Sequence, residues 1–260
     1  MNLYLYFSGT GNTKYVVKKF CELYEEKNEH KIISIEDETR DFDKLIKKAN
    51  IIAIAYPIYG SILPYILTDF LKTHMDSFKD KRIMTIATQA LFSGDGGALP
   101  YRELKQSNVK HLHSIHVNMP SNLVDVGIFP SKPIFKTKKK VLKADAKIKK
   151  VVARIQSGKT VKDGRRWYSR TIGYLFQRGL AKGMMERLRT KVKIDNDICI
   201  KCNQCVSTCP TGNLYNEDGM IQFKNQCTLC YRCVNQCPTK AISIFSKKKP
   251  KIQYTREDYN

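Results

Sequence analysis

The chain has 260 residues, with 46 Lys and Arg against 24 Asp and Glu, and a formal net charge of +22. No run of 18 or more uncharged apolar residues predicts a transmembrane helix, and the first residues lack the basic leader and cleavage site of a secretion signal, so we expect a cytoplasmic protein. The positive charge favours acidic proteins, nucleic acid or an anionic membrane surface as partners, although a solvated basic surface explains it equally well.

The first elements in the chain are a strand, a polar turn and a helix. Residues 2–7 predict a buried strand, and the loop Ser8-Gly-Thr-Gly-Asn-Thr13 follows it at once. A helix is predicted from about Asn12 to Glu25, because its apolar residues fall on one broad face. Cys21 lies on that face and is expected to be a small core residue.

Strands and helices then alternate up to about residue 156, which predicts an α/β fold with a parallel sheet and helices on both faces. The three histidines of the last predicted strand cannot all point to one face, so we interpret them as partly exposed strand residues and not as a metal site. They are His111, His113 and His116. The remaining strands are expected at 31–35, 51–55, 82–88 and 111–117, and the helices at 43–48, from about Pro64, at 97–107 and at about 135–156.

The next part of the chain is less regular. Residues 118–133 hold three prolines and predict a loop, and residues 156–164 predict a linker. An amphipathic helix is expected from about Trp167 to Arg189. Its basic residues suit a peripheral contact with a membrane surface, but packing across two domains of the same chain is the favoured interpretation.

Eight of the nine cysteines lie between residues 199 and 237, in two runs of the form Cys-x2-Cys-x2-Cys-x3-Cys-Pro that start 28 residues apart. Zinc sites usually use two separated CxxC pairs, and disulfides need oxidising conditions, whereas this compact run is typical of cubane iron–sulfur clusters. Three closely spaced cysteines can wrap one cluster, and the fourth then faces the other cluster. The predicted ligands are Cys199, Cys202, Cys205 and Cys237 for one [4Fe–4S] cluster, and Cys227, Cys230, Cys233 and Cys209 for the second.

Residues 192–245 resemble the bacterial-type ferredoxins that hold two [4Fe–4S] clusters. The resemblance rests on the two cysteine runs and on the repeated motif CV..CPT. It implies a small α+β domain whose two halves each contribute a hairpin and a helix. We expect this domain at 192–247, a connecting segment at 157–191 and a basic polar tail at 248–260.

The loop from Ser8 to Thr13 differs from two common phosphate loops. It lacks the GKS/T end of a Walker A loop, and Lys14 stands where the third glycine of the GxGxxG fingerprint would fall. Glycines, hydroxyls and a helix start still make an anion site. In a flavodoxin-like sheet of strand order 2-1-3-4-5, the loops at 57–60 and 88–95 would meet the loop from Ser8 to Thr13 at the switch point, where FMN binds.

Residues 1–156 resemble flavodoxins, because the loop has the pattern Ser8-x-Thr10-Gly11-x-Thr13. The whole chain resembles the fused flavodoxin–ferredoxin proteins of anaerobic bacteria and archaea. This implies a doubly wound, five-stranded parallel sheet, bound FMN, and a flavin ring stacked on Tyr59, with Phe92 as the second candidate; either could instead pack in the core. The FMN contacts expected are Ser8, Gly9, Thr10, Gly11, Asn12, Thr13, Pro57, Ile58, Tyr59, Gly60, Thr88, Gln89, Ala90, Leu91, Phe92, Ser93, Gly94 and Asp95.

Three functions stay open on the sequence alone. The favoured one is an electron-transfer protein that passes electrons between the clusters and FMN, with redox proteins such as acidic ferredoxins or flavodoxins as partners. The alternative is a flavin-dependent reductase of a small molecule, capped by the loop at 118–133, although no catalytic acid or base is indicated. A nucleic-acid-binding protein with structural zinc is disfavoured, because no recognised motif supports it.

Overall fold

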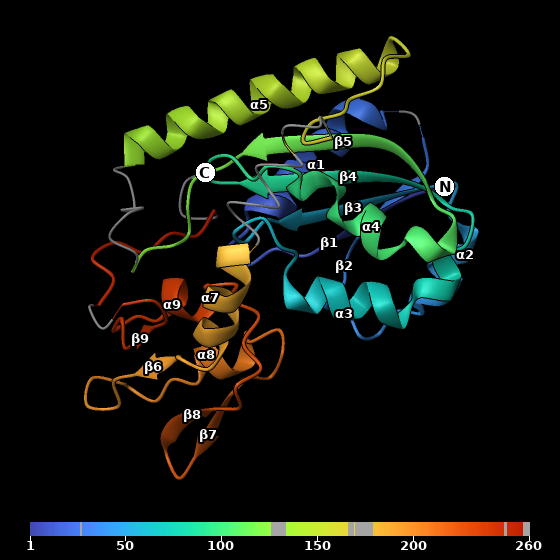
Figure 1. Ribbon diagram of the computed structural model, residues 1–260. Coiled ribbons are helices and arrows are strands. Elements are labelled where there is room, and N and C mark those ends of the chain that lie inside the picture. Colours follow the sequence, from blue (N-terminus) through green and yellow to red (C-terminus); the bar gives the residue numbers. More distant parts are fainter. Residues whose placement is uncertain (27, 126–133, 166–168, 170–178, 247–248, 257–260) are drawn as a thin grey trace.

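A five-stranded parallel sheet in the order β2-β1-β3-β4-β5 dominates the first half of the chain (Figure 1). The computed structural model describes residues 1–26, 28–125, 134–165, 169, 179–246 and 249–256. The strands are β1 (Asn2–Tyr6), β2 (His30–Ser34), β3 (Ile51–Pro57), β4 (Arg82–Gln89) and β5 (Lys110–Asn118). The flavodoxin-like order is confirmed, and it brings the carboxyl ends of β1, β3 and β4 together.

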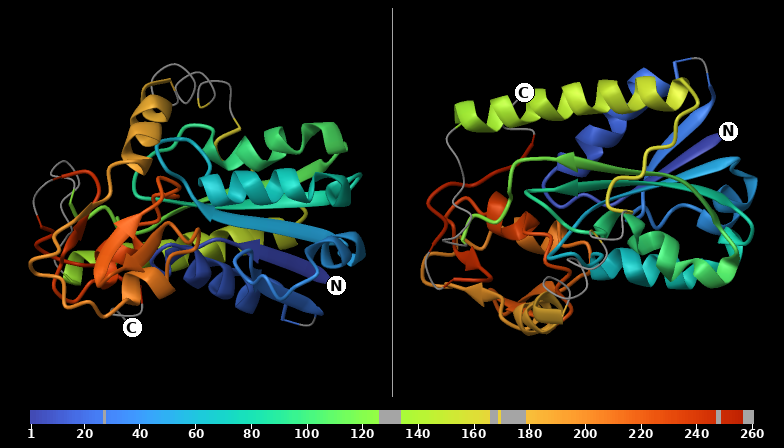
Figure 2. Two further views of the ribbon diagram at one scale, coloured as in Figure 1. Left: turned by 90° about the horizontal axis from the view of Figure 1, so that it is seen from below. Right: turned by 45° about the horizontal axis from the view of Figure 1, so that its top comes forward.

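Helices cover both faces of this sheet (Figures 1 and 2). Alternate residues of β1 face opposite ways, so Tyr4 joins one buried cluster and Leu3 and Leu5 join the other. Cys21 is buried in the first of these clusters, as expected. The helices on the Tyr4 side are α1 (Asn12–Tyr24) and α5 (Ile134–Gln156), and those on the other side are α2 (Phe42–Lys48), α3 (Tyr65–Thr73) and α4 (Leu99–Glu103).

The single helix expected at 97–107 is broken into three pieces. Short 3-10 turns at Gly96–Ala98 and Lys105–Ser107 flank α4. Pro100 has no N–H group and is tolerated only in a first turn, so a continuous helix cannot run through it. Gly97 also sits so close to β5 that a Cβ atom there would lie 2.3 Å from Nε2 of His116.

The three histidines of β5 do not follow simple alternation, because the strand is irregular. Ile83 pairs with His111 and the next residue, Met84, pairs with His113, so the register shifts between them. His111 Nε2 lies 3.0 Å from Oγ1 of Thr85. All three imidazoles are partly buried, as expected.

The stretch expected as a linker packs beside β5. The N–H group of Ser114 donates to the carbonyl of Val161 over 2.9 Å, and the N–H group of Asp163 donates back to the carbonyl of Ser114 over 2.9 Å. Lys147 of α5 forms an ion pair with Asp163 at 2.9 Å. The chain therefore returns to the edge of the sheet after α5.

The C-terminal part forms a second, smaller group of elements at the carboxyl ends of the strands (orange and red in Figure 1). β7 and β8 form a hairpin, and β6 pairs antiparallel with β9. A separate buried cluster, which includes Ile221, Val234 and Ile242, holds them together. The elements are α7 (Gly179–Arg189), β6 (Lys193–Ile194), α8 (Gln204–Ser207), β7 (Leu214–Glu217), β8 (Met220–Phe223), α9 (Arg232–Gln236) and β9 (Ile242–Ser243).

The helix expected from Trp167 to Arg189 is seen over its last part, as α7. Three of the expected segments lie partly outside the described residues. These parts are 166–168 and 170–178 of the expected helix, 126–133 of the expected loop, and 248 and 257–260 of the expected tail. In the ranges that the structure describes, no helix is both long and apolar enough to cross a membrane.

Candidate functional site

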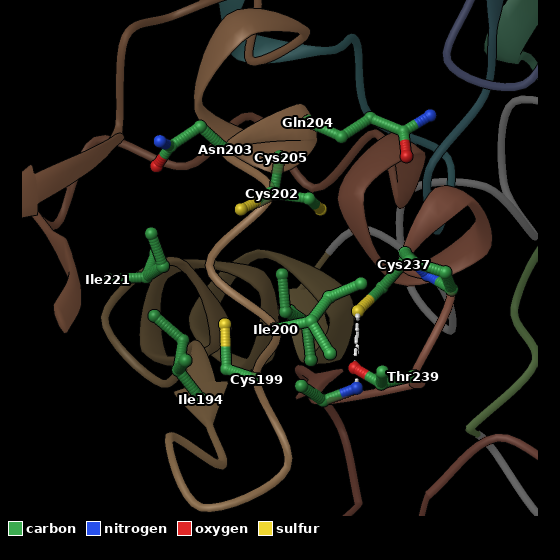
Figure 3. Close-up of a pocket in the computed structure, with 13 residues that line it drawn as sticks. Ile194, Cys199, Ile200, Cys202, Asn203, Gln204, Cys205, Ile221, Cys237 and Thr239 are labelled. Carbon is green, nitrogen blue, oxygen red and sulfur yellow. Dashed lines mark hydrogen bonds between the residues drawn. The ribbon is translucent and has the colours of Figure 1, made fainter. Parts of the chain in front are cut away.

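Cys199, Cys202, Cys205 and Cys237 line one cavity, together with apolar side chains such as Ile194 (Figure 3). Cys202 is exposed, and the neighbouring Ile200 is 62 % exposed. We call these four residues the outer cysteine set. The first three come from one run, whereas Cys237 closes the other run.

Cys209, Cys227, Cys230 and Cys233 line a second cavity. Cys227 and Cys230 are buried, so we call these four residues the inner cysteine set. Its fourth member, Cys209, ends the first run. The structure therefore groups the thiols in the crossed manner that the spacing predicts.

The two runs share one backbone conformation. Three residues of each copy have left-handed φ angles, and they recur at the 28-residue offset of the repeat. Left-handed φ is strained for bulky side chains and persists only where the surroundings impose it. Each run therefore curls around its cavity in the same way. The residues are Lys201 (56°), Asn203 (59°) and Gly212 (57°), repeated by Leu229 (59°), Tyr231 (62°) and Lys240 (57°).

Backbone N–H groups point at several of the sulfur atoms. Asn213 donates to Sγ of Cys209 over 3.2 Å, and Ala241 donates to Sγ of Cys237 over 3.2 Å. Such bonds stabilise charge on a ligating thiolate. Burial raises the pKa of Cys230 to about 12, so its thiol stays protonated at neutral pH unless bound iron supplies compensating charge.

The cysteine sets surround cavities and do not converge on points. Across the described residues, no group of three or more His, Cys, Asp or Glu side chains could hold a single metal ion. Tetrahedral zinc needs its four ligands within about 2.3 Å of one centre. A polynuclear cluster suits this arrangement better than zinc does.

Residues 191–238 match the family model described as a 4Fe-4S dicluster domain. This segment is an iron–sulfur domain. The chain therefore combines a five-stranded sheet in the flavodoxin-like order with a segment that matches a 4Fe-4S dicluster family. No curated protein matches the chain.

Solved structures similar to this chain include flavodoxins, at low identity. The two-electron reduced flavodoxin of Megasphaera elsdenii is 18% identical with a TM-score of 0.41, and the match covers 56% of this chain and 99% of that one. Flavodoxin 2 of Bacillus cereus is 13% identical with a TM-score of 0.42, covering 60% and 98%. The assignment of the fold rests on the strand order of the sheet itself.

The loop Ser8–Thr13 lies between β1 and α1 and keeps the features of an anion site. Gly11 is the N-cap residue of α1, has a φ of 91° and offers no side chain to cap the helix. From Gly9 to Thr13, no backbone N–H group donates a hydrogen bond to another described residue. These uncapped donors fit a phosphate group at the start of the helix.

Three side chains of this loop form hydrogen bonds within the protein. Nδ2 of Asn12 donates to the carbonyl of Pro120 over 2.9 Å. The hydroxyl oxygens of Thr13 and Thr88 lie 2.9 Å apart. Ser8 accepts the N–H group of Lys14 on its Oγ over 3.3 Å, which leaves the Ser8 hydroxyl proton able to donate elsewhere.

The C-terminal part of the chain covers the same loop. A Cβ atom on Gly9 would lie 2.3 Å from the carbonyl oxygen of Cys230, and one on Gly11 would lie 2.8 Å from Cβ of Arg256. The N–H group of Arg256 donates to the carbonyl of Thr10 over 2.8 Å. Both glycines therefore permit close approach of the iron–sulfur domain and the C-terminal segment, a role that the sequence did not indicate.

The two other expected FMN loops lie side by side. The N–H group of Ile58 donates to the carbonyl of Thr88 over 2.9 Å, and Oγ of Ser61 donates to the carbonyl of Ser93 over 2.9 Å. Asp95 is buried and pairs with Arg102 at 2.6 Å. The side chain of Gln89 donates to Asn118 over 2.8 Å, and the carbonyl of Ala90 accepts a hydrogen bond from Lys140. The side chains of Leu91 and Phe92 are largely exposed to solvent. Gly60 and Gly94 have left-handed φ angles.

The hydroxyl group of Tyr59 is buried and has no hydrogen-bond partner within the described part of the chain. Burial raises its pKa well above the usual range, and the nearby thiol of Cys230 adds to this rise. The side chain therefore lies close to the inner cysteine set. Its stacking on a flavin stays a prediction.

Sequence reasoning missed the residues that join the two halves. Asn122 donates through Nδ2 to the carbonyl of Cys230 over 3.1 Å, and Asp125 accepts the N–H group of Ile244 over 2.7 Å. The described part of the 118–133 loop thus packs into the iron–sulfur domain. Arg189 of α7 donates to the carbonyl of Cys227 over 2.9 Å and lies 3.9 Å above the ring of Tyr65. The helix α7 therefore bridges both halves, in agreement with the packing across two domains that the sequence favoured.

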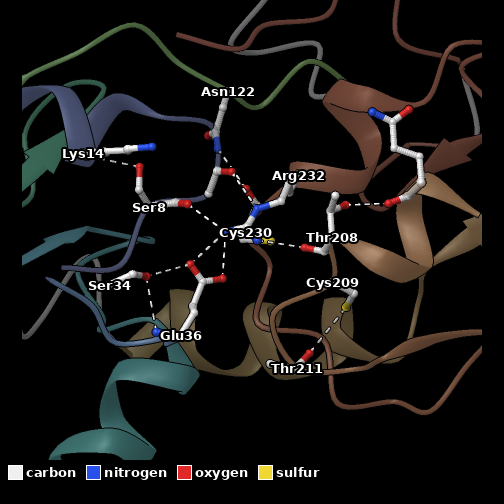
Figure 4. A network of polar contacts seen from close by, with 12 residues as sticks. Ser8, Lys14, Ser34, Glu36, Asn122, Thr208, Cys209, Thr211, Cys230 and Arg232 are labelled. Atoms are coloured by element: carbon white, nitrogen blue, oxygen red, sulfur yellow. Dashed lines mark hydrogen bonds and ion pairs between the residues drawn. The ribbon is translucent and has the colours of Figure 1, made fainter. Parts of the chain in front are cut away.

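Arg232 is the most connected of these missed residues (Figure 4). Its guanidinium donates to the carbonyls of Ser8, Gly9 and Thr208 over 2.9, 3.1 and 2.8 Å. The same group pairs with Oε1 of Glu36 at 2.8 Å. No motif in the sequence distinguishes Arg232 from the other basic residues.

Proposed function

We propose that this protein is an iron–sulfur flavoprotein that passes electrons between two [4Fe–4S] clusters and FMN, and so links one-electron carriers to a two-electron partner. The observation that carries the proposal is the contact between the inner cysteine set and the loop after β1, where Gly9 meets the backbone of Cys230. A cluster held by the inner set and a phosphate held by the loop would belong to neighbouring sites. Bound FMN exchanges electrons singly or in pairs.

The outer and inner cysteine sets would each hold one cluster. The loop Ser8–Thr13 would hold the FMN phosphate, and the residues at 57–60 and 88–95 would frame its ring. Uncapped N–H groups at the start of α1 and left-handed Gly11 support the phosphate assignment. In this proposal residues 1–156 form the FMN domain, 157–191 the connection, 192–247 the iron–sulfur domain and 248–260 the tail.

The two cysteine sets differ in exposure, and this suggests an order for the electron path. The outer set includes the exposed Cys202, so its cluster would exchange electrons with carriers in solution. The inner set shares its cavity with buried Val192 and Tyr231 and faces the loop after β1. Its cluster would therefore serve as the step next to FMN.

Anaerobic purification followed by metal, sulfide and flavin analysis tests this function. Two cubanes require about eight iron and eight sulfide per chain, together with one FMN released on denaturation. Zinc in place of iron would overturn the cluster assignment, and iron without flavin would overturn the FMN assignment. Reoxidation of the reduced protein by carrier proteins, and not by small molecules, would support electron transfer over a reductase.

A further inference from the structure

Arg232 joins three parts of the molecule through one side chain. It starts α9, two residues after Cys230 and directly before Cys233, and its side chain is 17% exposed. Its guanidinium donates to Ser8, Gly9 and Thr208 and pairs with Glu36 (Figure 4). Arginine suits such a site, because its planar fork presents several donors in fixed directions.

The bonds to the loop after β1 act on its anion-binding groups. The carbonyl of Ser8 shares a peptide unit with the N–H group of Gly9, and the carbonyl of Gly9 shares one with the N–H group of Thr10. Donation into a carbonyl polarises its peptide unit and fixes its orientation. Arg232 therefore strengthens and orients two N–H donors of the loop while it adds a positive charge behind them.

The same charge acts on the inner cysteine set. Arg232 lines the cavity of the inner cysteine set beside Cys230 and Cys233, so its positive charge favours negative charge in that cavity. Glu36 contributes the opposite charge at 2.8 Å from the guanidinium. The net field at the inner set thus depends on both members of this ion pair.

We propose that Arg232 is a positioning residue that couples the two cofactor sites. It holds the loop after β1 in its anion-binding conformation, and its charge favours the reduced, more negative state of the cluster in the inner set. The inference rests on the proposed function. Since coupling of binding is reciprocal, FMN in the loop should also change the reduction potential of the inner cluster.

Arg232→Gln and Glu36→Gln in the full-length, anaerobically purified protein test this idea. Redox titration followed by electron paramagnetic resonance gives the midpoint potential of each cluster, and titration of FMN into flavin-depleted protein gives its Kd. We expect Arg232→Gln to lower the inner-cluster potential and to weaken FMN binding about tenfold or more. Glu36→Gln should raise the inner-cluster potential, because it removes the opposing negative charge.

Two further variants separate charge from geometry. Arg232→Lys keeps the charge but loses the planar fork, so it should largely restore the potential and leave FMN binding weak. Arg40→Gln removes the same charge from an exposed arginine that pairs with Asp37 at 2.9 Å, and should change neither readout.

The coupling role would be overturned if Arg232→Gln and Glu36→Gln shifted the midpoint potential of the inner cluster in the same direction. It would also be overturned if either variant shifted the midpoint potentials of both clusters equally. If Arg232→Gln fails to retain iron, the sign of the shift in Glu36→Gln decides the matter alone. Failure of the proposed function would be distinct, because the unmodified protein would then lack iron or flavin.

Discussion

Cys209 is the last cysteine of the first run, but its thiol lines the cavity of the inner set. We therefore expect Cys209→Ala to disrupt the inner cluster before the outer one and to leave about four of the eight iron atoms. Iron analysis and electron paramagnetic resonance check this. Cys21→Ala serves as the control, because Cys21 is buried in the sheet core and should not affect the iron content. Selective loss of the outer cluster would contradict the crossed assignment.

Gly9 is a second residue at which the structure predicts the effect of a substitution on stability. A Cβ atom at this position would lie 2.3 Å from a backbone oxygen of Cys230, which cannot move as a side-chain tip can. Gly9→Ala should therefore destabilise the protein by about 1–3 kcal/mol. The midpoint of denaturant unfolding under anaerobic conditions measures this change.

Gly183→Ala is the matched control for Gly9→Ala. Gly183 lies in α7, and a Cβ atom there would meet nothing within 4 Å. The alanine should leave stability unchanged or raise it by up to about 1 kcal/mol, because alanine is the better helix former. Equal effects of the two substitutions would show that crowding at Gly9 is not what limits that position.

Residue-scale prediction from sequence succeeded where the pattern is local. The first three cysteines of each run group through gaps of two residues, and the repeat of the run supplies the fourth member of each set. The pairing of Arg232 with Glu36 joins residues 196 positions apart, and one arginine among 46 basic residues carries no distinguishing pattern. The grouping of the thiols was therefore predictable, and the charged side chains that surround them were not.

At the scale of elements, β5 predicts how stability depends on pH. Burial lowers the pKa of His111 and of His116 to about 4. In the unfolded chain each imidazole binds a proton with a pKa near 6.5, whereas in the folded protein it resists protonation. The contribution of these neutral histidines to folding stability is therefore complete above pH 6.5 and is lost as the pH falls toward 4. Each histidine should lower the free energy of unfolding by about 2 kcal/mol when the pH falls from 7 to 5.

Denaturant unfolding at pH 5, 6 and 7, followed by far-ultraviolet circular dichroism, measures this slope. In His116→Gln the fall in stability between pH 7 and pH 5 should be smaller by about 2 kcal/mol. The comparison uses the slope of each protein and not its absolute stability, since the new side chain alters packing against Gly97. An unchanged slope would show that His116 does not contribute to the acid sensitivity.

The strands of the sheet were predicted within two residues because each contains several apolar or β-branched residues and is bounded by turn residues. The helix at 97–107 was predicted as one piece and is broken, because Pro100 and the contact of Gly97 with His116 outweigh its periodicity. The linker at 156–164 looked polar and free, yet Val161 fills part of the core. Such tertiary contacts have no counterpart in local sequence.

At the scale of the whole molecule, charge predicts the behaviour with partners. In the proposed function, two cubanes with their thiolates and one FMN would lower the net charge only to roughly +16. We expect the rate of reduction by an acidic ferredoxin to fall steeply as ionic strength rises, because a Debye length of about 10 Å at 0.1 M screens long-range attraction. Stopped-flow measurement over a salt series checks this.

A small uncharged reductant of similar potential provides the control, and its rate should not change with salt. Equal salt dependence for both reductants, or none for the acidic ferredoxin, would contradict electrostatic steering. The order of the two halves was predictable from the motifs at Ser8 and Cys199. Their close contact was not, because it depends on small residues and backbone carbonyls that any loop could offer.

The C-terminal segment packs over the loop after β1, and this has a consequence for how the protein binds FMN during synthesis. Ser8 to Thr13 emerge early in synthesis, whereas Tyr254, which donates to Asn12 over 2.6 Å, and Arg256, which bonds Thr10, emerge late. An N-terminal sheet that folds first would leave this loop open to FMN during translation. We therefore expect flavin to enter before the chain is complete and to exchange only slowly with free FMN afterwards.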